Sequence, residues 1–238
     1  MTTSTKNQPK SVRYVINGLA TSPGYAMGKV RKISIREFSI VEEFITEDSV
    51  ENELRLFQQT MEKTFKEISK IKESTLERVG QNEARIFDSH LMMLKDPSLM
   101  GPILDSVKKE HKSLRWSIHI VITKLIQQFE SIDSEMMRER AMDLRDLYNR
   151  ILSILDDSVP TFSSEQFSEP IIFVGHELTP STLIGLPANS VLAFATDSGG
   201  KTSHASILAR AMQVPSVSGL RNISILAHDG DTMIVDGT

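Results

Sequence analysis

The 238-residue chain has no cysteine, only one tryptophan and no long hydrophobic run. Without cysteine it cannot form disulfides, cysteine-ligated zinc sites, iron–sulfur clusters or a cysteine nucleophile, and we expect a cytoplasmic protein. No stretch of about 18 apolar residues is present, so we expect no membrane insertion. The polar segment 1–10 has no apolar core of a signal peptide and is expected to be a disordered tail.

An excess of positive charge is also missing, because the chain has 27 basic and 31 acidic side chains and a net charge of −4. A protein that binds nucleic acid through its whole surface is usually basic, so we expect no nucleic-acid partner. Apolar residues make up 39% and charged residues 24% of the chain, which excludes a collagen-like or wholly disordered protein and leaves enough side chains for a core.

Glycine and proline are scarce in the middle of the chain and frequent at both ends. This distribution predicts an α/β domain built from two separate segments, 11–35 and 158–238, with an all-α helical bundle inserted over 36–157. The inserted segment has 18 basic and 24 acidic residues, a net of −6, whereas the rest of the chain has a net of +2.

The middle segment shows the apolar spacing of amphipathic helices. A long helix is expected to contain the stripe from Val50 to Ile68. Further helices are expected over 83–94, 98–110, 114–129 and 137–155, and short joins between them favour a bundle.

Short apolar runs bounded by turn residues indicate buried strands in the two flanking segments. We expect strands over 12–16, 27–34, 171–174, 191–195, 214–217 and 233–235. Helices are expected over 180–186 and 203–212.

The segment from Asp197 to Arg210 carries the most chemical information. Gly199 and Gly200 allow unusual backbone angles after a predicted strand, and Ser203 precedes a predicted helix whose first N–H groups favour an anion. His204 stands at this helix start, where a neutral imidazole nitrogen can act as a nucleophile. Taken alone, the string is also explained by a capping serine and a surface histidine.

The segment Asp197 to Arg210, continued by Val214 to Gly219, closely resembles the phosphohistidine signature of phosphoenolpyruvate-utilising enzymes. Other stretches resemble the N-terminal domain of one member, enzyme I of the phosphoenolpyruvate-dependent phosphotransferase system. They are Asn17 to Gly28, Ala84 to Asp96, Glu139 to Asp146 and Glu177 to Ser181.

This resemblance implies a phosphohistidine, or swivelling, α/β domain with an inserted bundle. It implies that His204 carries the phosphoryl group through Nε2 and that Thr179 holds the imidazole by a hydrogen bond. The residues implied for the phosphate pocket are Gly199, Gly200, Lys201, Thr202 and Ser203. Most relatives have arginine at the position of Lys201, and lysine lacks the bidentate fork of arginine.

A small histidine-containing phosphocarrier protein is the implied partner of the acidic bundle, since complementary charge steers association. The implied contacts are His90, Met93, Asp96 and Arg140. For His90 a structural role is an open alternative. The sequence itself indicates no metal site.

The resemblance also implies a C-terminal barrel beyond this chain, which would bind phosphoenolpyruvate and magnesium and dimerise the full protein. We therefore expect an N-terminal half that contains no cofactor, is monomeric alone and exchanges phosphate only with the carrier. Two alternatives stay open: the swivelling domain of a pyruvate phosphate dikinase or phosphoenolpyruvate synthase, and a regulatory module that docks a carrier without transferring phosphate.

Overall fold

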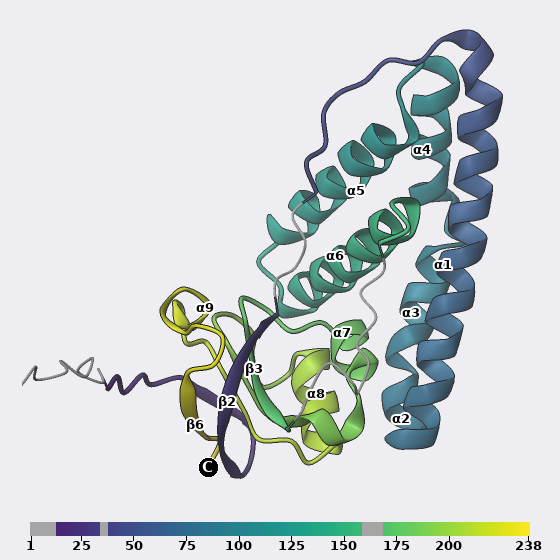
Figure 1. Cartoon of the computed structure of the whole chain (residues 1–238). Coiled ribbons are helices and arrows are strands. Elements are labelled where there is room, and N and C mark those ends of the chain that lie inside the picture. The colour runs from purple at the N-terminus through teal and green to yellow at the C-terminus, as the bar shows by residue number, and fades with distance from the viewer. Residues whose placement is uncertain (1–12, 34–37, 159–168) are drawn as a thin grey trace, which may run out of the picture.

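The computed structural model describes residues 13–33, 38–158 and 169–238, which form a mixed α/β domain and a helical bundle (Figure 1). The expected fold class is confirmed. The bundle enters the chain between two neighbouring strands of one sheet, so the α/β domain is built from both ends of the sequence. The predicted tail over 1–10 and the expected domain junction at 35–36 lie outside the described residues.

The α/β domain contains a six-stranded sheet in the order β1-β5-β4-β3-β2-β6. The strands are β1 (Leu19–Ser22), β2 (Tyr25–Ile33), β3 (Ile171–Gly175), β4 (Val191–Thr196), β5 (Ser216–Ser218) and β6 (Thr232–Asp236). Strands β2 to β5 run parallel to one another, whereas the edge strands β1 and β6 pair antiparallel with β5 and β2. The helices of this domain are α7 (Pro180–Gly185), α8 (His204–Ala211) and α9 (Ile223–Leu226).

Strand β3 shows why its sequence is apolar throughout. Ile172 and Val174 face the core beside α9, while Ile171 and Phe173 face the layer of α7 and α8. Both faces of the central strands are therefore buried, as is usual for a parallel sheet. The apolar core around Phe173 continues from this layer into the bundle without a break.

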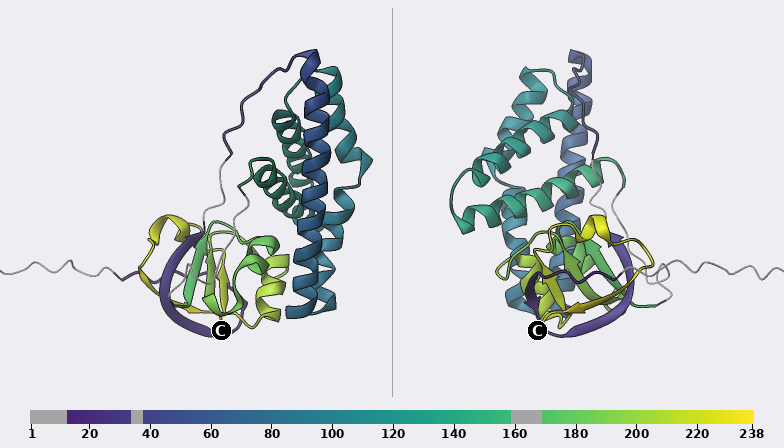
Figure 2. Two further views of the ribbon diagram at one scale, coloured as in Figure 1. Left: turned by 45° about the vertical axis from the view of Figure 1, so that its right-hand side comes forward. Right: turned by 90° about the vertical axis from the view of Figure 1, so that its left-hand side faces the viewer.

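The bundle consists of α1 (Val50–Arg78), α2 (Gln81–Ala84), α3 (Ile86–Met93), α4 (Pro97–Lys109), α5 (Leu114–Glu130) and α6 (Glu135–Leu155). Helix α1 runs along the bundle and reaches down to α7 (Figure 2), where Arg78 Nη1 donates to the carbonyl of Ile184 at 2.8 Å. In the parts of the chain that the structure describes, no helix is long and apolar enough to cross a membrane.

Two expectations for individual elements are wrong. The helix expected over 83–94 is divided at Arg85, whose N–H bonds to the carbonyl of Asn82 three residues back and tightens the turn. No strand forms over 13–16, where Tyr14 and Val15 are exposed. The first strand is β1, which is held by the buried hydroxyl of Thr21 donating to the carbonyl of Ser216.

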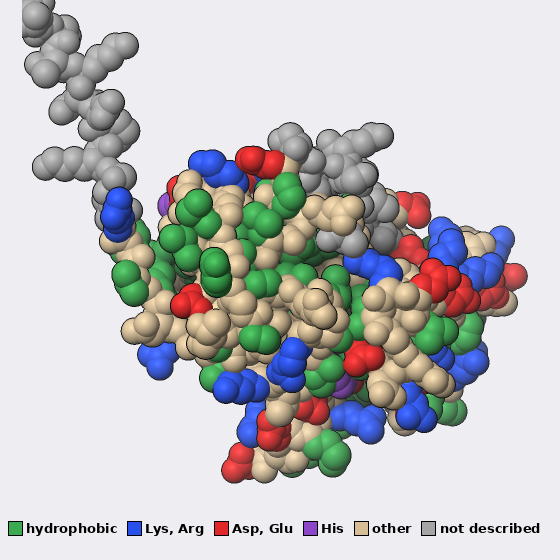
Figure 3. All heavy atoms as spheres, turned by 90° about the horizontal axis from the view of Figure 1, so that it is seen from below, with side chains coloured by type: hydrophobic (Ala, Val, Ile, Leu, Met, Phe, Trp, Pro, Cys, Tyr) green, Lys and Arg blue, Asp and Glu red, His purple; other side chains and the backbone are tan. Residues whose placement is uncertain are grey.

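The outer strands leave some hydrophobic side chains in contact with solvent. Met27 of β2 and Ile234 of β6 pair across the sheet, and both are exposed. Seen from below, the molecule shows hydrophobic side chains scattered among charged ones (Figure 3).

Candidate functional site

The loop that follows β4 is fixed from two sides. Asp197 is buried, and its carboxylate accepts hydrogen bonds from the N–H and the hydroxyl of Ser224. Gly199 has a φ of +114°, which favours glycine, and a Cβ there would lie 3.3 Å from the hydroxyl of Ser218. The loop backbone therefore reaches α8 in one defined conformation.

Helix α8 begins at His204 because Ser203 caps it. The Ser203 Oγ accepts the N–H of Ser206 at 3.3 Å, and it also lies 3.0 Å from the carbonyl of Gly200 as a donor. This is a conventional N-cap, which places the next residue in the first turn of the helix. Ser203 thus has the capping role that the string also allowed, and its hydroxyl is already engaged within the helix start.

His204 lies where the α/β domain meets the bundle. Its Nδ1 is 2.8 Å from Oδ1 of Asp143, which projects from α6. An ionised carboxylate can only accept, so Nδ1 carries the proton and Nε2 keeps a free lone pair. The hydrogen bond to Asp143 outweighs the opposing effect of burial and raises the pKa of His204. The geometry therefore fixes the tautomer in which Nε2 is the nucleophilic nitrogen.

Asp143 is the site residue that sequence reasoning missed. Burial alone would raise the pKa of this carboxyl, but the hydrogen bond from His204 and the nearby imidazole of His90 lower it to about 2. A signal existed in the sequence: Asp143 lies in phase with the apolar positions Leu147 and Ile151 on α6. A carboxylate in that phase is buried and needs a partner.

Helix α6 presents further polar contacts to the α/β domain. Thr202 Oγ1 donates to Glu135 at 2.8 Å, and Arg145 lies 3.8 Å from Glu177. Burial raises the pKa of Glu177, and the charge of Arg145 only partly offsets it. The junction between the domains is therefore rich in carboxylates contributed by one helix face and the loop after β3.

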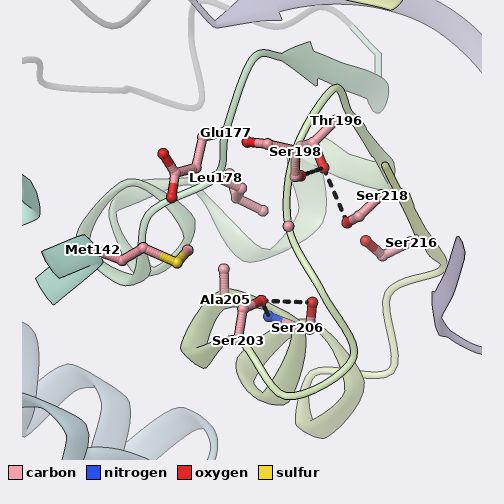
Figure 4. A pocket seen from close by; sticks show the side chains of 11 residues that line it. Met142, Glu177, Leu178, Thr196, Ser198, Ser203, Ala205, Ser206, Ser216 and Ser218 are labelled. Atoms are coloured by element: carbon pink, nitrogen blue, oxygen red, sulfur yellow. Dashed lines mark hydrogen bonds between the residues drawn. The ribbon is translucent and has the colours of Figure 1, made fainter. Parts of the chain in front are cut away.

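Two small cavities lie beside the start of α8. One, about 20 Å³, is lined by His204, Asp143, Glu139 and Glu177 among others. The second, about 10 Å³, is lined mainly by hydroxyl side chains (Figure 4). These hydroxyls belong to Thr196, Ser198, Ser203, Ser206, Ser216 and Ser218. A cavity of this size holds about one water molecule.

The predicted role of Thr179 differs from the structure. Thr179 lines the same cavity as His204. However, its Oγ1 accepts the N–H of Thr182 at 3.2 Å as the N-cap of α7, and the imidazole is bonded to Asp143 instead. The hydroxyl of Thr179 also lies 3.0 Å from that of Thr182, and the observed partner of the imidazole is Asp143.

The other residues expected in the phosphate pocket lie in the loop before His204. Gly200 has open space around its Cα, and Lys201 is exposed. The side chain of Thr202 turns toward Glu135 on the bundle. Their contact with a phosphate remains a prediction.

The four expected partner contacts differ in their exposure to solvent. His90 is 1% exposed, so it cannot contact a docked protein, and its imidazole faces the interior of the bundle. Met93 is half-buried against the bundle core. Asp96 and Arg140 are exposed, and Asp96 caps α4 by accepting the N–H of Ser98 at 2.8 Å. Within the described ranges, no three side chains of the kinds that ligate metals come together.

Comparison with known proteins places the chain in a family. Residues 17–140 match the model of the PEP-utilising enzyme, N-terminal, and residues 167–238 match the PEP-utilising enzyme, mobile domain. Two curated relatives are called phosphoenolpyruvate-protein phosphotransferase. The one from Staphylococcus aureus is 37% identical over 94% of this chain and 39% of its own length, and the one from Bacillus sp. is 34% identical over 93% and 38%. The chain thus spans about two fifths of the length of these relatives.

Two solved structures resemble this chain over most of its length. An NMR solution structure of enzyme I matches with a TM-score of 0.72 and 38% identity, covering 94% of this chain and 90% of that one. The N-terminal domain of Enzyme 1 - Nitrogen matches with a TM-score of 0.61 and 25% identity over the same shares. The chain therefore belongs to the PEP-utilising enzymes, and within them it corresponds to the N-terminal region of enzyme I, the phosphoenolpyruvate-protein phosphotransferase.

Proposed function

We propose that this chain carries a phosphoryl group on Nε2 of His204 and exchanges it with a histidine of a small phosphocarrier protein. One observation carries the proposal. The hydrogen bond from Nδ1 to Asp143 leaves the Nε2 lone pair as the free nucleophile of a neutral imidazole.

Transfer from the carrier exchanges one P–N bond for another. The Nε2 lone pair of His204 attacks the phosphorus in line, and the P–N bond of the carrier breaks with its electron pair returning to the carrier imidazole. In the resting protein the Asp143 carboxylate at Nδ1 holds the ring in the tautomer whose Nε2 can attack. No other side chain needs to form a covalent bond.

In the whole protein, phosphoenolpyruvate would be the ultimate donor. The same lone pair would attack its phosphorus, the P–O bond would break, and the enolate of pyruvate would take a proton from solvent. We assign the binding of phosphoenolpyruvate and magnesium to the rest of the full-length protein. For the docking of the carrier, the net charge of −6 over residues 36–157 suits a basic partner.

The arrangement around His204 suits the resting protein. The cavity beside the ring is about 20 Å³, which is too small for a phosphoryl group, and Glu139 and Glu177 line it. The negative charge of these carboxylates also disfavours an anionic phosphoryl group at close range. We infer that the imidazole leaves this position, or the two domains separate, before phosphorylation.

The test is the intact mass of the chain after mixing with a phosphocarrier protein that is phosphorylated on its histidine. The wild type should gain one acid-labile phosphoryl group, and His204→Ala should gain none. His176→Ala is the matched control, because this exposed histidine also lies at the end of a central strand, and it should behave as the wild type. Equal gain in His204→Ala would overturn the proposal, and carrier binding without gain would identify a docking module.

A further inference from the structure

His90 is a buried histidine that the proposed transfer does not use. It lies on α3 with its ring edge-on to Phe87, the ring centroids 5.7 Å apart. Its Nε2 is buried and, among the described residues, has no hydrogen-bond partner. Most buried polar atoms in folded proteins are paired, so this nitrogen needs an explanation.

The carboxylate oxygen that faces this nitrogen already accepts a hydrogen bond from His204. Nε2 of His90 lies 3.6 Å from Oδ1 of Asp143, the same oxygen that receives Nδ1 of His204 at 2.8 Å. The longer distance lies beyond the range of a hydrogen bond, so the oxygen is bonded to His204 and only approached by His90. Oδ1 of Asp143 is thus hydrogen-bonded to the imidazole of His204 and lies near the imidazole of His90 without a hydrogen bond.

The two imidazoles belong to different domains. His204 starts α8 in the α/β domain, whereas His90 and Asp143 both lie in the bundle. Any separation of the domains would remove His204 from Asp143 and leave His90 in place. The side chain of Asp143 is 7% exposed, and leaving such a carboxylate without a donor is unfavourable.

We propose that His90 is a positioning residue. It donates a hydrogen bond to Asp143 when His204 leaves Asp143 to receive or deliver the phosphoryl group. A small movement closes the 3.6 Å gap, and Nε2–H then donates to Oδ1. The neutral tautomer of His90 suffices, so no proton has to move. Because Asp143 stays paired in both states, the departure of His204 becomes less unfavourable. This inference rests on the proposed phosphoryl transfer.

The kinetic test uses His90→Phe, which removes the donor but keeps an aromatic ring against Phe87, and His90→Gln, which restores an N–H donor. Phosphoryl acceptance is timed by intact mass with a phosphohistidine-bearing carrier and with phosphoramidate, a small donor that needs no docking. We expect His90→Phe to slow acceptance about tenfold with both donors, which is the worth of one hydrogen bond to a charged group. His90→Gln should recover most of the rate.

A second background separates positioning from simple packing. In Asp143→Asn the buried charge is gone, so adding His90→Phe should cause no further slowing. Equal slowing in both backgrounds would assign His90 to packing alone. If the wild type accepts phosphate and His90→Phe accepts it at the same rate, the proposed hydrogen bond from His90 to Asp143 is refuted. If the wild type accepts phosphate from neither donor, the proposed function itself fails.

An equilibrium measurement does not depend on transfer rates. In His204→Ala the natural partner of Asp143 is removed, so the Nε2–H of His90 should give an exchange-protected NMR signal that is weaker in the wild type. Unchanged His90 signals in the two proteins would overturn the inference, even if His90→Phe fails to fold.

Discussion

The hydrogen bond between His204 and Asp143 makes the stability of the protein depend on pH in a defined way. The perturbation that tests this is Asp143→Asn. Asparagine keeps an oxygen that can accept from Nδ1 of His204, so the shape of the site is retained while its negative charge is removed. The change therefore isolates the charge from the geometry.

The magnitude follows from the carboxyl group. Its pKa falls from 3.8 to about 2 on folding, and at about 1.4 kcal/mol for each unit this corresponds to about 2–3 kcal/mol of stability at neutral pH. The raised pKa of His204 describes the same interaction from the other partner and is not added to this figure. We expect the free energy of unfolding of Asp143→Asn to be lower by about this amount.

The contributions of His204 and Asp143 to the free energy of unfolding change with pH in opposite directions. The histidine has a raised pKa in the folded state, so its contribution is complete below the unfolded value of 6.5 and is lost as the pH rises through the folded pKa. The carboxyl has a lowered pKa, so its contribution is complete above 3.8 and is lost as the pH falls toward about 2. The difference between wild type and variant should therefore be largest between about pH 4 and about pH 6.

The assay is urea unfolding of both proteins at about pH 5.5 and about pH 8.5, with the pKa of His204 measured by NMR titration. Asp146→Asn is the control, because Asp146 is equally buried on the same helix and its contact is the N–H of Ser181. Its effect should be alike at the two pH values. The reasoning would be refuted if the pKa of His204 were unchanged in Asp143→Asn. It would also be refuted if the difference in the free energy of unfolding between wild type and variant were the same at both pH values.

Three further outcomes are expected from the loop and the helices. Gly199→Ala should cost about 1–3 kcal/mol because its φ is +114°, whereas Gly200→Ala, with open space around it, should change the free energy of unfolding by less than about 0.5 kcal/mol, both measured in urea. Asp96→Ala should lower the melting temperature by removing the cap of α4, and Asp96→Asn, which still caps, should lower it less; equal losses in thermal unfolding would contradict the capping role. Phe87→Ala should cost about 3–5 kcal/mol, since the ring is fully buried; a loss below about 1 kcal/mol in urea would contradict its place in the core.

Much of the fold could be predicted because its signals are local. The stripe containing Phe57, Phe65 and Ile68 has the spacing of one helix face, and these residues do pack into the bundle core. The run from Ile171 to Val174 is apolar because β3 is buried on both faces. For these elements, burial alone determines the residue types.

The first strand could not be found in this way. Leu19 and Ala20 are followed by Thr21 and Ser22, whose buried side chains are hydroxyls, so β1 has no apolar run. Thr21 is stabilised by a hydrogen bond to Ser216, 195 residues along the chain. Tyr14 and Val15 have suitable residue types for a strand but no neighbouring strand to pair with in the described structure.

Only the part of the site that has a local sequence pattern could be predicted. His204 stands in a local pattern of glycines and hydroxyls that marks a strand, a loop and a helix start. Asp143 lies 61 residues earlier, and its role exists only because α6 packs against the start of α8. A contact between two domains leaves no short-range pattern, so the imidazole partner was assigned to Thr179 instead.

The order of strands in the sheet has a consequence for biosynthesis. β1 pairs with β5, and β2 pairs with β3 and β6, so the strands made first await partners made much later. The bundle, in contrast, is complete as soon as α6 has been made, and many of its contacts join helices that follow one another in sequence. Because local contacts form faster than distant ones, we expect the bundle to fold first on the ribosome. The sheet would then close around chain ends that the folded bundle has already brought together.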